Sequence, residues 1–224
     1  MANKNEQVNG VSAEAQINKT EEFFQKNKKS IIIGIIALFV IAGGVVAFNR
    51  WNSSRSDQAS TVLAKGQDLF AGEQFEKALN GDGASFPGFL KVADEYGSTD
   101  AGNLSKLYAG LCYAKLGKWE EAATWLDKFS ARDDQMISPA AEGALGNAYA
   151  HLNQLDKAVK HLKNAAEKAD NNSLSPVFLI QAGEILESQG KKAEALALYQ
   201  QIKTKYFNSY QYQSIDKYIE RVAE

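Results

Sequence analysis

One spacing recurs three times in the second half of the chain, and it constrains the fold more than any other feature. In each of three segments a glycine is followed after three residues by a large side chain, and after nine more by an alanine. The segments repeat with a period of 36 and then 37 residues. The positions are Gly110, Tyr113 and Ala122; Gly146, Tyr149 and Ala158; and Gly183, Leu186 and Ala195. Internal repetition at this period predicts a stack of helical hairpins.

The residue types at these positions suit two antiparallel helices in close contact. Glycine lets the first helix approach its neighbour, and the large side chain one turn later lies on the same face. The alanine marks the crossing on the second helix, and Leu126, Leu162 or Tyr199 follows it by four residues on the same face. Two units begin with Ser-Pro, at Ser138 and Ser175, and we expect these serines to act as helix N-caps.

These residues and spacings resemble the tetratricopeptide repeat family, whose unit is about 34 residues. The third unit departs from the family pattern because Leu186 replaces the aromatic residue, and the usual terminal proline is replaced by Asp134, Asp170 and Phe207. The resemblance implies an all-α chain that forms a right-handed α-solenoid, with three repeats over 103–209. The alternative is an unrelated helical bundle.

The flanking segments are expected to complete the solenoid. Residues 56–97 read as a degenerate first hairpin, with a long helix over 56–80, a turn at NGDG and a returning helix in ASFPGFLKVADEYG. Residues 211–224 predict a C-terminal capping helix, which the open end of a solenoid needs. Its apolar face comprises Ile215, Tyr218, Ile219 and Val222.

The stretch from Ile31 to Phe48 contains eighteen residues without a charged or strongly polar side chain. As a helix it measures about 27 Å, close to the bilayer hydrocarbon thickness of about 30 Å. We therefore predict a transmembrane signal-anchor helix over 30–51, in contact with lipid through 31–48. Two alternatives are a cleaved signal peptide, whose apolar run is normally shorter, and a core helix, which would need a larger protein around it.

The charges beside this span predict its orientation. Three lysines lie in 26–29, immediately before the span, whereas Arg50 and Arg55 follow it. The positive-inside rule then places the N-terminus in the cytoplasm and the repeats in the periplasm. We expect a single-pass protein of the bacterial inner membrane, with a polar and mostly disordered cytoplasmic tail over 1–29. The alternative for the tail is a short amphipathic helix that contains Ile17, Phe23 and Phe24.

Composition argues against several functional classes. The 25 Lys and Arg residues nearly balance 27 Asp and Glu residues, without the basic patch that nucleic-acid binding requires. The single cysteine, Cys112, cannot form an intrachain disulfide or a Cys-rich zinc site, and we expect it to pack as a small apolar residue. His151 and His161 fall on different helices, with His161 expected at the surface. We predict a non-enzymatic protein without metal or cofactor.

The resemblance also implies a binding surface, because in this family the first helix of each hairpin lines a concave face. The positions that it places there are Leu104, Leu107, Leu111 and Lys115; Ala140, Asn147 and His151; and Ile180, Glu184 and Glu187. The apolar part could hold an amphipathic segment of a partner. Alternatively, the first hairpin covers these leucines, and they belong to the core.

A short tail, one span and exported repeats resemble the family of ancillary subunits of the bacterial Sec translocon. That resemblance implies a membrane-tethered scaffold that binds other proteins or exported polypeptides, including the translocon and periplasmic chaperones. It would assist protein export or periplasmic folding. The alternative with the same architecture is a structural coordinator of envelope assembly or cell division.

Overall fold

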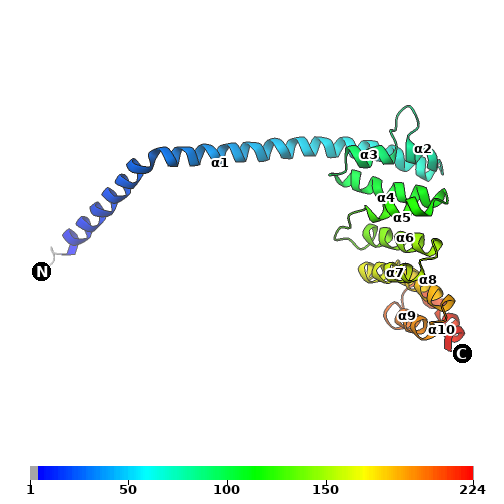
Figure 1. Cartoon of the computed structure of the whole chain (residues 1–224). Coiled ribbons are helices and arrows are strands. Elements are labelled where there is room, and N and C mark those ends of the chain that lie inside the picture. The colour runs from blue at the N-terminus through cyan, green and yellow to red at the C-terminus, as the bar shows by residue number, and fades with distance from the viewer. Residues whose placement is uncertain (1–4, 224) are drawn as a thin grey trace. The chain divides into compact units, whose positions relative to one another are not determined.

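The computed structural model describes residues 5–223, with side-chain surroundings for 25–34 and 36–223. Every regular element in this part of the chain is a helix, and the hairpins stack in chain order (Figure 1). The chain divides into two units, Met1–Ser54 and Arg55–Glu224, and the stacked hairpins belong to the second. The elements are α1 (Asn5–Ala71), α2 (Phe75–Asn80), α3 (Phe89–Glu95), α4 (Asp100–Lys115), α5 (Trp119–Asp127), α6 (Ile137–His151), α7 (Leu155–Ala169), α8 (Ser175–Ser188), α9 (Lys192–Lys205), the 3-10 helix η1 (Tyr210–Ser214) and α10 (Ile215–Ala223).

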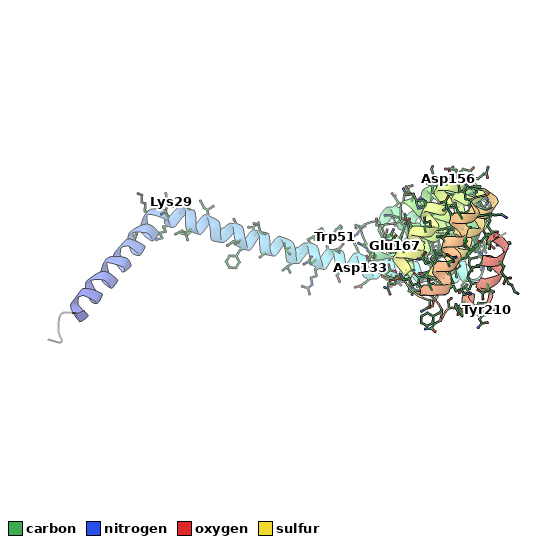
Figure 2. All side chains as sticks on the ribbon, turned by 90° about the horizontal axis from the view of Figure 1, so that it is seen from below. Lys29, Trp51, Asp133, Asp156, Glu167 and Tyr210 are labelled. Atoms are coloured by element: carbon green, nitrogen blue, oxygen red, sulfur yellow. The ribbon has the colours of Figure 1, made fainter. Side chains whose placement is uncertain are left out.

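Helix α1 contains the apolar stretch. Among the described residues it is the one helix long and apolar enough to cross a membrane, with a mean hydropathy of 3.0 over eighteen residues. None of that window is buried inside the protein, whereas a core helix would be mostly buried. Lys29 and Trp51 stand on either side of the apolar stretch (Figure 2).

The described part of the N-terminal tail differs from the prediction. We expected disorder over 1–29, but residues 5–29 continue α1 without a break. This segment has no proline and is rich in Glu, Gln and Lys, which are good helix formers. Once the apolar stretch is helical, each further residue adds to an existing helix and avoids the cost of nucleation. Residues 1–4 lie outside the described residues.

The first hairpin turns earlier than its sequence predicted. Helix α1 ends at Ala71, before the expected limit of residue 80, and Glu73 adopts a left-handed φ of 58°. The N–H of Gln74 then donates to the carbonyl of Leu69 across the turn. The NGDG sequence instead begins an eight-residue loop that separates α2 from α3. The returning helix is therefore broken into two short pieces.

This early turn shows that the unit occurs four times. Each hairpin turn has one residue in the left-handed region and the same six-residue hydrogen bond that ends a helix in a Schellman motif. The left-handed residues are Glu73, Gly117, Asn153 and Gly190. On the two sides of the first turn, Gly66 and Leu69 of α1 and Ala78 of α2 repeat the spacing of three and nine residues.

The glycines of the repeat allow close contact between the paired helices. A Cβ at Gly110 would lie 2.6 Å from Cγ of Leu126, and one at Gly146 would lie 2.9 Å from Cγ of Leu162. These separations are shorter than any normal carbon contact, so only glycine fits. At Gly183 the same role falls to the ring of Tyr199, and the partnered alanines Ala122, Ala158 and Ala195 are fully buried.

The two Ser-Pro sequences do not provide the N-caps that we predicted. Helix α6 begins at Ile137, and the carboxylate of Asp134 accepts the backbone N–H groups of Ile137 and Ser138. Before α8, the side chain of Asn171 binds the amides that lead into the helix. Because Asp134 and Asn171 stand four residues before the serines, they reach the free amides first. The serine hydroxyls bond to neighbouring segments instead.

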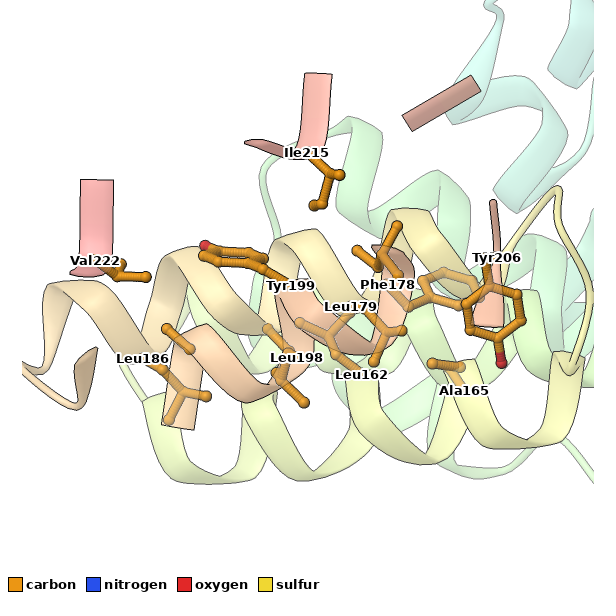
Figure 3. Packing of buried hydrophobic residues seen from close by; sticks show 14 residues of the cluster. Leu162, Ala165, Phe178, Leu179, Leu186, Leu198, Tyr199, Tyr206, Ile215 and Val222 are labelled. Carbon is orange, nitrogen blue, oxygen red and sulfur yellow. The ribbon is translucent and has the colours of Figure 1, made fainter. Parts of the chain in front are cut away.

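The C-terminal core joins the last two hairpins to α10, the capping helix of the solenoid. Ile215 and Val222 of α10 pack into the cluster that contains Phe178, Leu186 and Tyr199 (Figure 3). Tyr199 is fully buried at its centre. The helix therefore covers an apolar surface that the last repeat would otherwise expose.

Candidate functional site

The three leucines expected on the concave face of α4 differ in their burial. Leu107 is 8% exposed and belongs to the core that α4 shares with α6. Leu104 and Leu111 are half-buried against the same core. Leu107 therefore belongs to the core, in the cluster formed with α5 and α6, whereas Leu104 and Leu111 present part of their side chains to solvent.

Three polar positions of the predicted surface are accessible along successive first helices. Lys115 on α4 and Glu184 on α8 are exposed, and Asn147 on α6 is half-buried. Their side chains have no hydrogen bond or ion pair with any other described residue. Ala140 is exposed at the start of α6, and Ile180 is half-buried against the C-terminal core. These side chains are available to a partner.

Two other predicted residues already have partners within the chain. The ring of His151 stacks on Trp119 with 3.6 Å between centroids and 3° between planes. Glu187 accepts two hydrogen bonds from Arg221 of α10, at 2.8 and 2.7 Å, and one from the hydroxyl of Tyr199. These contacts tie α10 to α8 and α9, so Glu187 serves the capping helix.

The electrostatics of this contact follow from its geometry. Burial alone would raise the pKa of Glu187, but the donors Arg221 and Tyr199 outweigh burial and hold that pKa below its usual range. Burial, and then the adjacent carboxylate, raise the pKa of Tyr199. Glu187 is therefore ionised and Tyr199 neutral at physiological pH.

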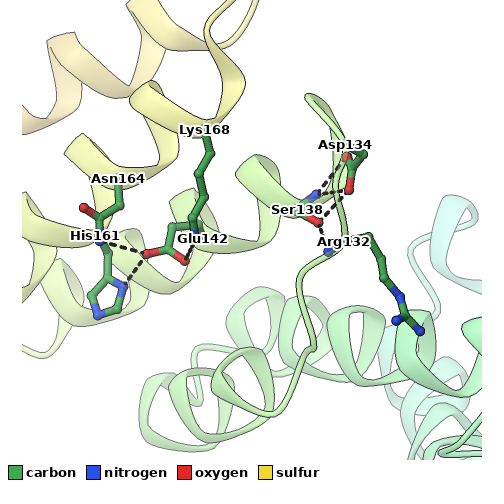
Figure 4. A network of polar contacts seen from close by, with 7 residues as sticks. All are labelled: Arg132, Asp134, Ser138, Glu142, His161, Asn164 and Lys168. Carbon is green, nitrogen blue, oxygen red and sulfur yellow. Dashed lines mark hydrogen bonds and ion pairs between the residues drawn. The ribbon is translucent and has the colours of Figure 1, made fainter.

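A second polar cluster joins α6 to α7 (Figure 4). Glu142 accepts from Lys168 at 3.0 Å and from Asn164 at 3.4 Å, and it contacts Nδ1 of His161 at 3.0 Å. The prediction of a surface position for His161 was wrong, because its side chain is only 22% exposed. Burial raises the pKa of Glu142, but these partners outweigh burial and lower it. This polar cluster therefore holds α6 against α7, with the Glu142–Lys168 ion pair as part of it.

A cavity of about 480 Å³ lies beside α4 and the segment between α5 and α6. Leu104, Phe129 and Ile137 form its apolar lining. Its polar lining comprises Asp100, Asn103, Arg132 and Asp134. Of these residues, sequence analysis singled out only Leu104 for binding. The available signal was the polar run ARDDQ after Phe129, which interrupts the second helix of the unit.

The described residues contain no group of three or more His, Cys, Asp or Glu side chains that could hold a metal ion. Cys112 is fully buried, and burial raises the pKa of its thiol to about 12. A thiol in this environment is a packed apolar group.

A family model described as a tetratricopeptide repeat-like domain matches residues 21–216. The chain belongs to this family. The matched range begins before the apolar stretch of α1 and extends into α10, so the tetratricopeptide repeat-like family accounts for both units of the chain.

Comparison with individual proteins agrees with this assignment. A protein of Aggregatibacter actinomycetemcomitans named ancillary SecYEG translocon subunit is 24% identical over 192 residues, which cover 85% of this chain and 88% of the relative. Two crystal structures of TPR-like repeats from a Podosopora anserina kinesin light chain each have a TM-score of 0.53 and 15% identity. Each match covers 75% of this chain and 94% of the solved one. At that identity, these structures establish the fold only.

Proposed function

We propose that this chain is a membrane-tethered scaffold that binds other proteins and assists protein export or periplasmic folding near the Sec translocon. The observation that carries the proposal is the extent of the likeness to the ancillary SecYEG translocon subunit, which covers 85% of the chain. A match of that extent must include parts of both the apolar helix and the repeats. Tetratricopeptide repeats generally bind extended or helical segments of other proteins.

The apolar stretch of α1 is the proposed anchor. Lysines at 26, 28 and 29 precede it, and this cluster supports a cytoplasmic N-terminus with the repeats in the periplasm of a bacterial cell. In this orientation the scaffold stands where exported chains emerge from the membrane. A tether also raises the effective concentration of the repeats beside any partner in the same membrane.

The proposed binding surface follows the first helices of the last three hairpins. Lys115, Asn147 and Glu184 offer charged and amide groups there, and the half-buried Leu104 and Leu111 offer apolar area. This mixture suits an amphipathic segment of a polypeptide, because apolar contacts supply affinity while polar contacts fix orientation. We assign the chain no catalytic role.

In-cell photo-crosslinking tests the proposal. A crosslinking amino acid at Lys115 or Glu184 should capture translocon subunits, export chaperones or exported chains, which mass spectrometry would identify. The matched control carries the crosslinker at Glu167, an exposed residue of α7, a second helix of its hairpin (Figure 2). Capture equal to that control would refute a binding surface on the first helices. Enrichment of cell-wall or division proteins would instead support the role in envelope assembly.

A further inference from the structure

The cavity beside Leu104 exists because one second helix stops early. Helix α5 ends five residues after Ala122, whereas α7 and α9 continue for eleven and ten residues after Ala158 and Ala195. About one and a half helical turns that the other hairpins possess are therefore missing here. Residues 128–136 replace them as an irregular segment. The cavity is thus the gap that the missing turns leave beside α4.

The irregular segment is held in place by side chains. The amide of Asn103, which is 4% exposed, donates to the carbonyl of Ser130 at 2.7 Å and accepts from its N–H at 2.8 Å. The N–H of Arg132 donates to the hydroxyl of Ser138 at 2.7 Å. These bonds replace part of the lost helix ladder, so the gap is preformed. A preformed cavity spares a ligand the cost of ordering the site.

The lining of the gap indicates what it can hold. Leu104, Phe129 and Ile137 supply its apolar surface, and Ile137 is 46% exposed. The neighbouring Met136 is 56% exposed. Burial of these groups against an apolar side chain is favourable, and about 480 Å³ is within the range of ordinary ligand pockets.

The charge around the gap is negative. Among the residues that line the gap, Asp100 and Asp134 stand against the single cation Arg132, a net charge of −1, and Asp133 adjoins Arg132 and Asp134 in the chain. Arg132 is already paired with Asp100 at 2.8 Å. The carboxylate of Asp134 remains ionised because hydrogen bonds from the start of α6 and from Ser138 outweigh burial and hold its pKa low. An incoming segment would therefore gain from positive charge beside its apolar anchor.

We infer that this gap, lined by Leu104, Phe129 and Ile137, is the docking site for a large apolar side chain flanked by Lys or Arg in an extended partner polypeptide. The inference rests on the proposed scaffold function and adds the chemistry of the segment that is bound. It also places the strongest contact in the unit with the broken helix, at the start of the predicted surface.

Fluorescence anisotropy with the full chain in detergent tests this inference. The probe is a short labelled peptide with a Lys-Leu-Leu-Lys core, compared with Glu-Leu-Leu-Glu and Lys-Ser-Ser-Lys versions. We expect the first peptide to bind at least about tenfold more tightly than either of the others. Each of the others lacks one type of favourable contact, and loss of a single binding hot spot weakens affinity by about this factor. Added salt should reduce that preference over the acidic peptide.

Variants of the chain locate the binding. Ile137→Ser should weaken binding of the Lys-Leu-Leu-Lys peptide about tenfold, whereas Phe207→Ser, at another exposed apolar residue that lies outside the gap, should not change it. Asp133→Lys should shift preference toward the acidic peptide. Circular dichroism of each variant verifies folding, and the Asp133 exchange supplies a test that removes no apolar contact.

Two results would overturn the inference. Equal binding by Ile137→Ser and Phe207→Ser would exclude the gap, and equal binding of the basic and acidic peptides would exclude the charge selection. If crosslinks from Lys115 and Glu184 still captured export proteins, the scaffold function would stand without this site. Loss of both peptide binding and crosslinks would refute the two together.

Discussion

Addition of one methyl group at Gly183 tests the packing rule behind the repeats. In Gly183→Ala, the new Cβ would lie 2.6 Å from Cζ of Tyr199, closer than two carbons normally approach. The ring cannot move aside easily, because Tyr199 is fully buried and its hydroxyl donates a hydrogen bond to Glu187. The helix or the ring must therefore move, and such overpacking costs about 1–3 kcal/mol.

The helix itself gains from the same change, and the balance sets the expected magnitude. Replacement of glycine by alanine inside a helix is worth about 0.5–1 kcal/mol. Because the fixed ring cannot relax away from the new methyl group, we expect the overpacking cost to lie in the upper part of its range. After subtraction of the helix gain, the net destabilisation should be about 1–2 kcal/mol. For a domain of this size the melting temperature should fall by about 2–8 °C.

Thermal unfolding of the full chain in detergent, followed by circular dichroism at 222 nm, measures this loss. The matched control is Gly72→Ala, where the nearest atom to the added Cβ, the carbonyl oxygen of Asp68, is 3.4 Å away. This control should leave the melting temperature unchanged or raise it slightly. If Gly183→Ala were as stable as Gly72→Ala, close contact would not explain why glycine occupies this position.

Three further predictions concern buried polar groups and the thiol. Asn103→Ala should cost about 1–3 kcal/mol in urea unfolding, because it removes both bonds to Ser130, and an unchanged midpoint would contradict their role. The lowered pKa of Glu142 means that its ionised form stabilises the fold at neutral pH and that this contribution is lost as the pH falls below its ordinary value of 4.5. The stability difference between wild type and Glu142→Gln should therefore shrink from pH 7 to pH 3.5, and a constant difference would refute the coupling. Cys112 should react with a thiol reagent at pH 8 only after denaturation, because burial raises its pKa to about 12, and fast labelling of the folded chain would show that the thiol is accessible.

The sequence predicted the all-helical solenoid because its packing rule leaves a local trace. A helix that touches its partner closely needs a small residue at one position, and a large one must occupy the neighbouring space. Gly146 and Leu162 form such a pair within one hairpin, so their spacing is fixed by the length of one turn and two short helices. The apolar stretch was equally visible, since its requirement is one of length and composition.

The candidate site was harder to predict because its contacts join residues far apart in the chain. Glu187 appeared as an accessible acid, but Arg221 is 34 residues away and no local pattern pairs the two. His161 meets Glu142 across nineteen residues. The gap beside Leu104 arises from the early end of a helix, and helix ends are set by a few competing hydrogen bonds. The Asn103 amide that holds the irregular segment has no counterpart in the repeat pattern.

The first hairpin shows how an insertion hides a repeat without abolishing its packing. Gly66, Leu69 and Ala78 keep the spacing of the later units, but the next glycine of the series comes 44 residues later, because an eight-residue loop divides the returning helix. The loop brings Phe86 and Phe89 over Gly66, where a Cβ would lie 2.5 Å from Cε1 of Phe89. Two aromatic rings thus fill the place that Leu126, Leu162 or Tyr199 fills in the later units. The glycine keeps the same role although its partner comes from a different segment, so the contact, more than the period, defines the unit.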